Sequence, residues 1–152
     1  MTLIQGKKKG GDEQFTPSWL FKALDVTFDL DPAHPEEPTN VPCKTFFTKK
    51  QNGLEQNWHG FVWMNPPFSE SKLWVEKFLE HDNGLMLIPM SKAKWFLELW
   101  NNPKAQIVAL PASIKFDLPN GLQNSIFTLT CIVACGVQAH EVLFKANLGQ
   151  MR

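Results

Sequence analysis

The sequence lacks long apolar runs and has few cysteines, and each shortage excludes a class of protein. No stretch of the 152 residues approaches the roughly 18 uninterrupted apolar residues that a membrane-spanning helix needs. The segment from Met1 to Gly11 lacks the apolar region of a secretory signal, so we expect a cytoplasmic protein. The three cysteines include no CxxC pair, which argues against a disulfide framework and a zinc ribbon and favours reduced thiols.

A net charge of one sign is also missing, because fifteen lysines and arginines balance fifteen acidic residues. A strongly basic balance is typical of avid nonspecific nucleic-acid binders, so overall charge neither supports nor excludes DNA as a partner. The lysines do cluster, as Lys7 to Lys9, as Lys44 with Lys49 and Lys50, and as Lys92 with Lys94. Such clusters either contact phosphates, if the fold gathers them, or form an ordinary solvated surface.

The composition that remains is typical of one globular domain, at 43% hydrophobic and 20% charged residues. Residues 1–14 carry a lysine run and Gly10-Gly11 with little apolar content, so we expect a flexible lead-in there. Residues 15–152 are expected to form a single domain.

Apolar spacing and turn residues predict helices and strands in alternation. Helices are predicted over 17–24, from a cap at Ser71 to Asn83-Gly84, and over about 92–100. Strands are predicted over 26–30, 61–64, 85–88, 107–110, 126–135 and 142–144, with a loop-rich stretch from 32 to about 57. Thr16 followed by Pro17 fits a helix N-cap with proline at the first position. Strands alternating with helices early and following one another late indicate an α/β sheet whose last part is antiparallel.

Two loops follow predicted strands at the sheet edge where α/β proteins generally bind ligands: Asp31-Pro32-Ala33 and Asn65-Pro66-Pro67-Phe68. In the second loop, two prolines stiffen the backbone, so that an amide oxygen and a carbonyl lie on one side and an aromatic face follows. That arrangement suits an exocyclic amino group, which offers two N–H donors, on a base extruded from a duplex. The alternative is a rigid proline turn that only ends a strand.

Further motifs accompany these loops: Phe15-Thr16-Pro17, Phe28 to Leu30, Phe47-Thr48, Asn52-Gly53-Leu54, Trp58-His59-Gly60, Trp74-Val75, and a strand-like stretch from Ser125 to Val133. In their order and spacing the chain resembles the phage-type DNA N6-adenine methyltransferases, the phage Dam family. The resemblance implies a Rossmann-like S-adenosylmethionine-dependent methyltransferase sheet, with S-adenosylmethionine as methyl donor and adenine N6 in DNA as acceptor. If a phage or prophage encodes the chain, the cytoplasm is that of the host.

The resemblance also implies a role for the second loop as the catalytic motif. Asn65 and Pro66 would position the amine, Pro67 would complete the rigid loop, and Phe68 would stack on adenine. Phenylalanine stands where tyrosine is common in the family, but stacking does not require the hydroxyl. The implied reaction is a direct displacement, in which the amine attacks the methyl carbon without a covalent enzyme intermediate.

The donor site implied by the resemblance contains Thr16, Pro17, Asp31 and Pro32. A carboxylate such as Asp31 can accept hydrogen bonds from the donor's ribose hydroxyls or amino group. Asp29 is a second candidate, because strand alternation predicts that it shares a face with Asp31. The glycine-rich turn usual at nucleotide sites is absent after Asp31.

We expect Lys44, Lys49 and Lys50 to contact DNA, and we expect no metal. His34, His59, Cys43 and Asp31 are zinc-ligand types without paired close spacings. Two alternatives stay open. One keeps the fold and the donor but transfers the methyl group to a glutamine side chain or an RNA base. The other is a degenerate methyltransferase fold that only binds nucleic acid or a partner protein.

Overall fold

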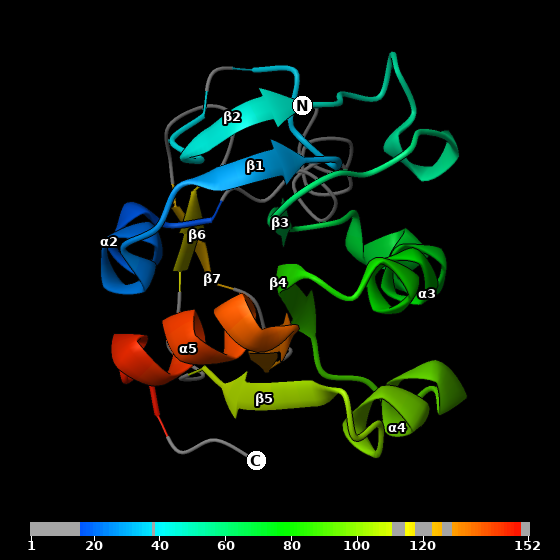
Figure 1. Cartoon of the computed structure of the whole chain (residues 1–152), viewed down its shortest axis with the longest axis vertical. Helices are drawn as coiled ribbons and strands as arrows, with labels where there is room; N and C mark the ends of the chain where they lie inside the picture. The colour runs from blue at the N-terminus through cyan, green and yellow to red at the C-terminus, as the bar shows by residue number, and fades with distance from the viewer. Residues whose placement is uncertain (1–15, 38, 111–114, 118–122, 126–128, 150–152) are drawn as a thin grey trace, which may run out of the picture.

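The protein is built on a six-stranded sheet with the strand order β2-β1-β3-β4-β8-β5 (Figure 1). The computed structural model describes residues 16–37, 39–110, 115–117, 123–125 and 129–149. The sheet strands are β1 (Phe28–Asp31), β2 (Cys43–Phe46), β3 (Val62–Met64), β4 (Gly84–Pro89), β5 (Ala105–Ala109) and β8 (Thr130–Cys135). The lead-in expected over residues 1–14 and the start of the strand predicted from residue 126 lie outside the described residues.

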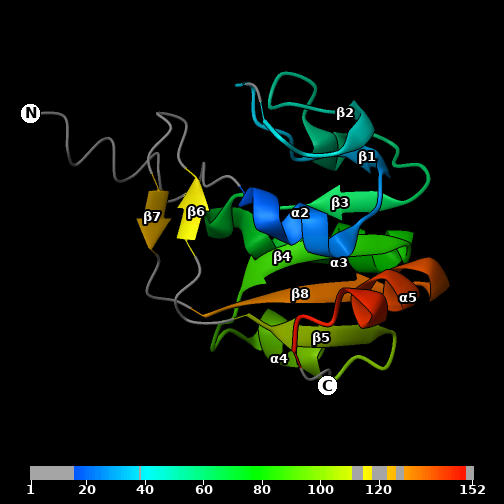
Figure 2. The same cartoon turned by 90° about the vertical axis from the view of Figure 1, so that its left-hand side faces the viewer.

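Strand directions confirm the predicted α/β sheet with an antiparallel last part. Strands β2, β1, β3 and β4 pair in parallel, whereas β8 pairs antiparallel with both β4 and β5. A separate two-stranded ribbon, β6 (Lys115–Asp117) with β7 (Gln123–Ser125), stands beside one end of the sheet (Figure 2) and was not predicted. The loop-rich stretch after β1 carries the edge strand β2 and a short 3-10 turn, η1 (Gly53–Glu55).

Helices cover both faces of the sheet, as the two sides of Figure 1 show. They are α2 (Ser18–Leu24), α3 (Ser71–His81), α4 (Lys94–Trp100) and α5 (Val137–Ala146), with a second 3-10 turn, η2 (Phe68–Glu70), before α3. The helices α2 and α5 share one apolar core with β1, β3, β4, β5 and β8, and α3 and α4 share another on the opposite face. Within the described part of the chain, no helix is long and apolar enough to cross a bilayer.

The prediction of a final strand over 142–144 is wrong, because this segment lies inside helix α5. Ala139 and Leu143 are buried four residues apart, which is the spacing of one helix face, whereas Phe144 is 71% exposed. Three consecutive apolar residues suggested a short buried strand, and a run of this length does not distinguish a strand from a helix.

Element ends also differ from the predictions. Helix α2 begins at Ser18 with Pro17 as its N-cap, so Thr16 does not cap it. Helix α3 begins at Ser71, which was predicted as its cap, and ends at His81, with Asp82 (φ 56°) as its C-cap in the place predicted for Asn83-Gly84. Strand β1 begins at Phe28 and includes Asp31. These shifts of one or two residues leave the order of the predicted elements intact.

Candidate active site

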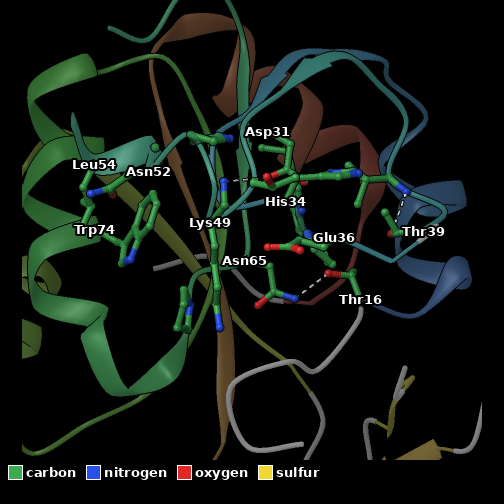
Figure 3. A pocket seen from close by; sticks show the side chains of 18 of the residues that line it. Thr16, Asp31, His34, Glu36, Thr39, Lys49, Asn52, Leu54, Asn65 and Trp74 are labelled. Atoms are coloured by element: carbon green, nitrogen blue, oxygen red, sulfur yellow. Dashed lines mark hydrogen bonds and ion pairs between the residues drawn. The ribbon is translucent and has the colours of Figure 1, made fainter. Parts of the chain in front are cut away.

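The loops that follow β1 and β3 line one cavity of about 390 Å³ (Figure 3). Asp31 is the last residue of β1, and Asn65 directly follows β3. Because β1 pairs in parallel with β3, the carboxyl ends of the two strands lie at the same edge of the sheet. The structure therefore brings the Asp31 loop and the Asn65 loop, both predicted as site loops, together at one cavity.

Asn65 is fixed by a residue far away in the sequence. Its side-chain Nδ2 donates a hydrogen bond to the hydroxyl of Thr16 at 2.9 Å, drawn as a dashed line in Figure 3. Thr16 is 3% exposed and also lines the cavity. With Nδ2 engaged by Thr16, the amide oxygen of Asn65 lies on the other side of the amide group. The turn before α2 therefore orients the side chain proposed to bind the amine.

Asp31 is a buried carboxylate at the cavity wall, 2% exposed. One oxygen accepts the Ala33 N–H at 3.1 Å, and the other lies 2.7 Å from His34 Nδ1. Burial raises the pKa of Asp31, and the hydrogen bonds from His34 and Ala33 only partly oppose that rise. The ring of Phe46 stacks on His34 with centroids 4.2 Å apart, which holds the imidazole in place.

Asp29 does not share the Asp31 face, so the expectation from strand alternation is wrong. The amides of Asp29 and Leu30 both donate to the Phe61 carbonyl, at 2.8 and 3.4 Å, which is the hydrogen-bond pattern of a β-bulge. The Asp29 carboxylate instead accepts the Phe61 N–H at 2.8 Å and lies 3.5 Å from Lys44 Nζ. The backbone hydrogen bond from Phe61 is the main cause that lowers the Asp29 pKa.

The Asn-Pro-Pro-Phe loop divides its residues between two hollows. Asn65 and Pro67 line the cavity with Asp31, while Pro66 is buried. Phe68 instead lines a second hollow of about 500 Å³, together with Trp95 of α4. Among the described residues at the first cavity, neither Phe68 nor Pro17 is a wall residue. The loop therefore separates the two hollows.

The three lysines predicted to contact DNA have different surroundings. Lys49 lines the cavity, Lys44 is paired with Asp29, and Lys50 is exposed. The acidic residues described around the cavity are Asp31, Glu36, Glu37 and Glu70, against one lysine, Lys49. This wall is therefore mainly acidic and suits a ligand that carries positive charge.

Gly53 is a site residue whose role the sequence analysis missed. It lines the cavity, and a Cβ atom there would overlap the backbone carbonyl of Pro32. Only a residue without a side chain lets the 52–54 segment approach the Asp31 loop so closely. The Asn52-Gly53 dipeptide is a turn signal that was visible in the sequence, although the close approach was not.

The fold also gathers residues that looked unrelated in the sequence. Potential ligand atoms of Asp31, His34 and Cys43 all lie within 4.8 Å of one another. Cys43 is distant from Asp31 in the sequence and comes close to it through the parallel pairing of β1 with β2, so sequence spacing did not indicate this group. His59, the fourth residue considered, has its Nε2 3.3 Å from the Thr45 hydroxyl.

Known proteins match the part of the chain that forms this site. A family model described as DNA N-6-adenine-methyltransferase (Dam) matches residues 4–125, which include both loops. A curated DNA N-6-adenine-methyltransferase of Escherichia phage T1 is 35% identical over 98 residues, covering 60% of this chain. That match spans 40% of the phage protein's length. No solved structure matches the chain.

Proposed function

Because the chain belongs to the DNA N-6-adenine-methyltransferase (Dam) family, as its motifs predicted, we propose that it transfers a methyl group from S-adenosylmethionine to the exocyclic amine of adenine in DNA. The observation that carries the proposal is the meeting of the Asn65 loop with the Asp31 loop at one cavity. In this proposal the sheet is a Rossmann-like methyltransferase sheet, supported by its parallel strands and the antiparallel β8.

The cavity has the properties that the donor requires. Its volume of about 390 Å³ lies within the range of roughly 300–1,000 Å³ typical of small-molecule sites. S-adenosylmethionine carries a sulfonium, an ammonium and a carboxylate, so its net charge is positive and complements the acidic wall. Trp74 and Leu54 line the cavity and supply apolar side chains for an adenine ring.

Particular residues would hold the donor's polar groups. The Asp31 carboxylate accepts hydrogen bonds from a ribose hydroxyl or the amino group. Lys49, which is also predicted to contact DNA, lines this cavity and would offer a cation to the donor's carboxylate. Thr16 and Pro32 complete the wall on either side of Asp31.

Asn65 and Pro66 supply acceptors for the target amine. When bound, S-adenosylmethionine provides an electrophilic methyl group on its sulfonium. The amide oxygen of Asn65 and the carbonyl of Pro66 accept the two N–H groups of the amine and turn its lone pair toward the methyl carbon. Positive charge would develop on the nitrogen during attack, and the two oxygens would stabilise it because the loop is rigid before the reaction begins. As the new C–N bond forms, the methyl–sulfur bond would break and S-adenosylhomocysteine would leave, and the amine would then lose one proton to solvent.

Phe68 would take part from the other side of the same loop. Phe68 and Trp95 both line the second hollow, so a base extruded from DNA would stack there without entering the donor cavity. The target base would then lie in the second hollow and the donor in the first, with the Asn-Pro-Pro-Phe loop contributing residues to both. Stacking on an aromatic ring contributes about 1–3 kcal/mol per base in single-strand complexes, enough to hold the base during transfer.

The test is transfer of labelled methyl groups from S-adenosylmethionine to mixed-sequence DNA, followed by digestion to nucleosides. We expect the label in N6-methyl-2'-deoxyadenosine and in no other nucleoside. RNA or an acceptor protein is supplied in place of DNA in parallel reactions. Label in RNA or in a glutamine of the protein, with none in DNA, would favour the alternative acceptors. Absence of both transfer and donor binding would favour a degenerate fold that only binds a partner.

A further inference from the structure

A cluster of three chemically different side chains lies at the edge of the proposed donor cavity. The Asp31 carboxylate, the His34 imidazole and the Cys43 thiol place their potential ligand atoms within 4.8 Å of one another. Carboxylate oxygen, imidazole nitrogen and thiolate sulfur are the ligands that zinc uses in proteins. We propose that Asp31, His34 and Cys43 bind a zinc-class divalent cation and that this cation competes with the methyl donor.

The distances are compatible with a tetrahedral ion after a small adjustment of side chains. Zinc bonds of roughly 2.0–2.3 Å place neighbouring ligand atoms about 3.3–3.6 Å apart. The contact between Asp31 Oδ2 and His34 Nδ1 is 2.7 Å, and the widest separation in the cluster is no more than 4.8 Å. The distance between Asp31 Oδ2 and His34 Nδ1 must therefore lengthen, and the widest separation in the cluster must shorten, by roughly 1 Å each.

Two of the three ligands are held by neighbours that leave them able to bind an ion. The second oxygen of Asp31 accepts the Ala33 N–H at 3.1 Å, and the His34 ring is stacked on Phe46. Contacts of this kind orient metal ligands in known sites and cost affinity when removed. The side chains of His34 and Asp31 are only 9% and 3% exposed, so the ion would be largely shielded from bulk water.

The fourth coordination position would open toward the donor cavity. Both Asp31 and His34 line that cavity, whereas Cys43 packs against the apolar core on the α2 side. Binding removes the proton from the Cys43 thiol, which passes to solvent, and it replaces the hydrogen bond between His34 Nδ1 and Asp31 Oδ2 with bonds to the ion. Zinc-binding chemistry with three protein ligands and an open position is typical of sites that admit a further ligand.

The competition follows from the double use of Asp31 and rests on the proposed function. A carboxylate oxygen bound to a cation is a weaker acceptor of hydrogen bonds from the donor, and the ion neutralises the negative charge of Asp31 that would attract the donor's net positive charge. We therefore expect stoichiometric zinc to weaken binding of S-adenosylmethionine at least tenfold. The chain would then methylate only where free zinc is low.

Cobalt(II) is the probe for the site, because it replaces zinc and its thiolate complexes absorb light. The full chain, treated with chelator, is titrated with cobalt in the absence of donor. We expect a thiolate-to-cobalt charge-transfer band and the visible bands of tetrahedral cobalt. Cys43→Ala should lose the charge-transfer band, and His34→Ala should weaken cobalt binding at least tenfold. Cys131 and Cys135 are fully buried in β8 and should not contribute.

His59→Ala is the matched control, since His59 is an exposed histidine outside the cluster and should leave the cobalt spectrum unchanged. Cys43→Ser keeps the size of the side chain and replaces Cys43→Ala if the alanine variant does not fold. Absence of the band in the unmodified chain, or its persistence in both Cys43 variants, would overturn the site.

Donor binding is then measured by calorimetry with and without stoichiometric zinc. A tenfold or greater loss of affinity supports the competition, and unchanged affinity with a normal cobalt spectrum overturns the competition alone. If the chelator-treated chain binds no donor at all, the proposed function fails, while the cobalt spectrum still decides the metal site independently.

Discussion

Thr16 and Asn65 show at the scale of single residues how distant motifs combine. The sequence assigned Thr16 to the donor and Asn65 to the amine, and it predicted Thr16 as a helix cap. The hydrogen bond between them, at 2.9 Å, could not be foreseen, because it requires the turn before α2 to reach the end of β3. Residue types identified the candidates, whereas the partner of each came from the fold.

Replacing Thr16 with valine tests whether this hydrogen bond orients Asn65. Thr16→Val keeps the shape of the side chain and removes the acceptor, so the hydrogen bond that holds Asn65 Nδ2 is lost. We expect turnover to fall about five- to tenfold, since a net hydrogen bond is worth about 1 kcal/mol. The control is Thr27→Val at an exposed threonine. Equal turnover in both variants and the unmodified chain would exclude this role.

The ionised Asp31 side chain lowers the stability of the fold, and its proposed role in donor binding accounts for its presence. Burial raises the folded-state pKa of Asp31 above its unfolded-state pKa, so the fold is favoured when this carboxyl is protonated. This stabilisation is complete below the unfolded-state pKa and is lost as the pH rises through the folded-state pKa. Asp31→Asn should therefore stabilise the donor-free protein at neutral pH and weaken donor binding. In thermal unfolding the stability gain should vanish below about pH 3.9. A variant that is less stable than the unmodified chain only at neutral pH would contradict this sign.

At the scale of elements, strong patterns were predictable and local hydrogen bonding was not. The apolar runs that became β3 and β4, bounded by turn residues, identified both strands and the helix between them. Strand β2 was missed because its residues from Lys44 to Phe46 are exposed, so no apolar pattern marks it. The bulge at Asp29 was missed because two amides sharing the Phe61 carbonyl leave no trace in residue order.

Helix α5 gives a direct test of the corrected element. Leu143 is 1% exposed in the α2-side core, and Phe144 points outward. Leu143→Ala should lower the free energy of unfolding by about 2–5 kcal/mol, whereas Phe144→Ala should change it little. Chemical denaturation measures both. The reverse order of effects would contradict the helix and its register.

Gly53 tests how closely the turn η1 must approach the Asp31 loop. A methyl group in Gly53→Ala would meet the Pro32 carbonyl, so one loop must move. We expect weaker donor binding and a lower melting temperature. Gly149→Ala is the control, because its Cβ would lie an ordinary 3.5 Å from the nearest side-chain atom, Val108 Cγ1. Donor affinity equal in the two variants would show that the approach does not matter.

At the scale of the whole molecule, strand order creates the site. The chain makes β1, β2 and β3 in sequence, but β2 joins the outer edge and leaves β1 beside β3. The sequence predicted that Asp31 and Asn65 follow strands, yet it could not predict that these strands are neighbours. Long-range pairing of this kind depends on how apolar faces and crossover segments pack together, which local patterns do not encode.

The arrangement of the strands also explains why the sequence spacing argued against a metal site. Ligand spacings are informative when one turn or helix supplies several ligands, as in zinc ribbons. Here His34 lies three residues after Asp31 in the same loop, whereas Cys43 comes from the start of the neighbouring strand and is brought close by the sheet. The same sheet edge thus carries both the proposed donor cavity and the proposed cation site.

The central claim is a division of labour between the two loops, with Asp31 holding the donor and Asn65 the amine. The direct test measures donor binding and methyl transfer to DNA in the unmodified chain, Asn65→Ala and Asp31→Asn. We predict that Asn65→Ala binds S-adenosylmethionine normally but loses transfer by at least a hundredfold, about 2.7 kcal/mol of transition-state stabilisation. Asp31→Asn should instead lose donor affinity. Unimpaired transfer by Asn65→Ala would contradict the account.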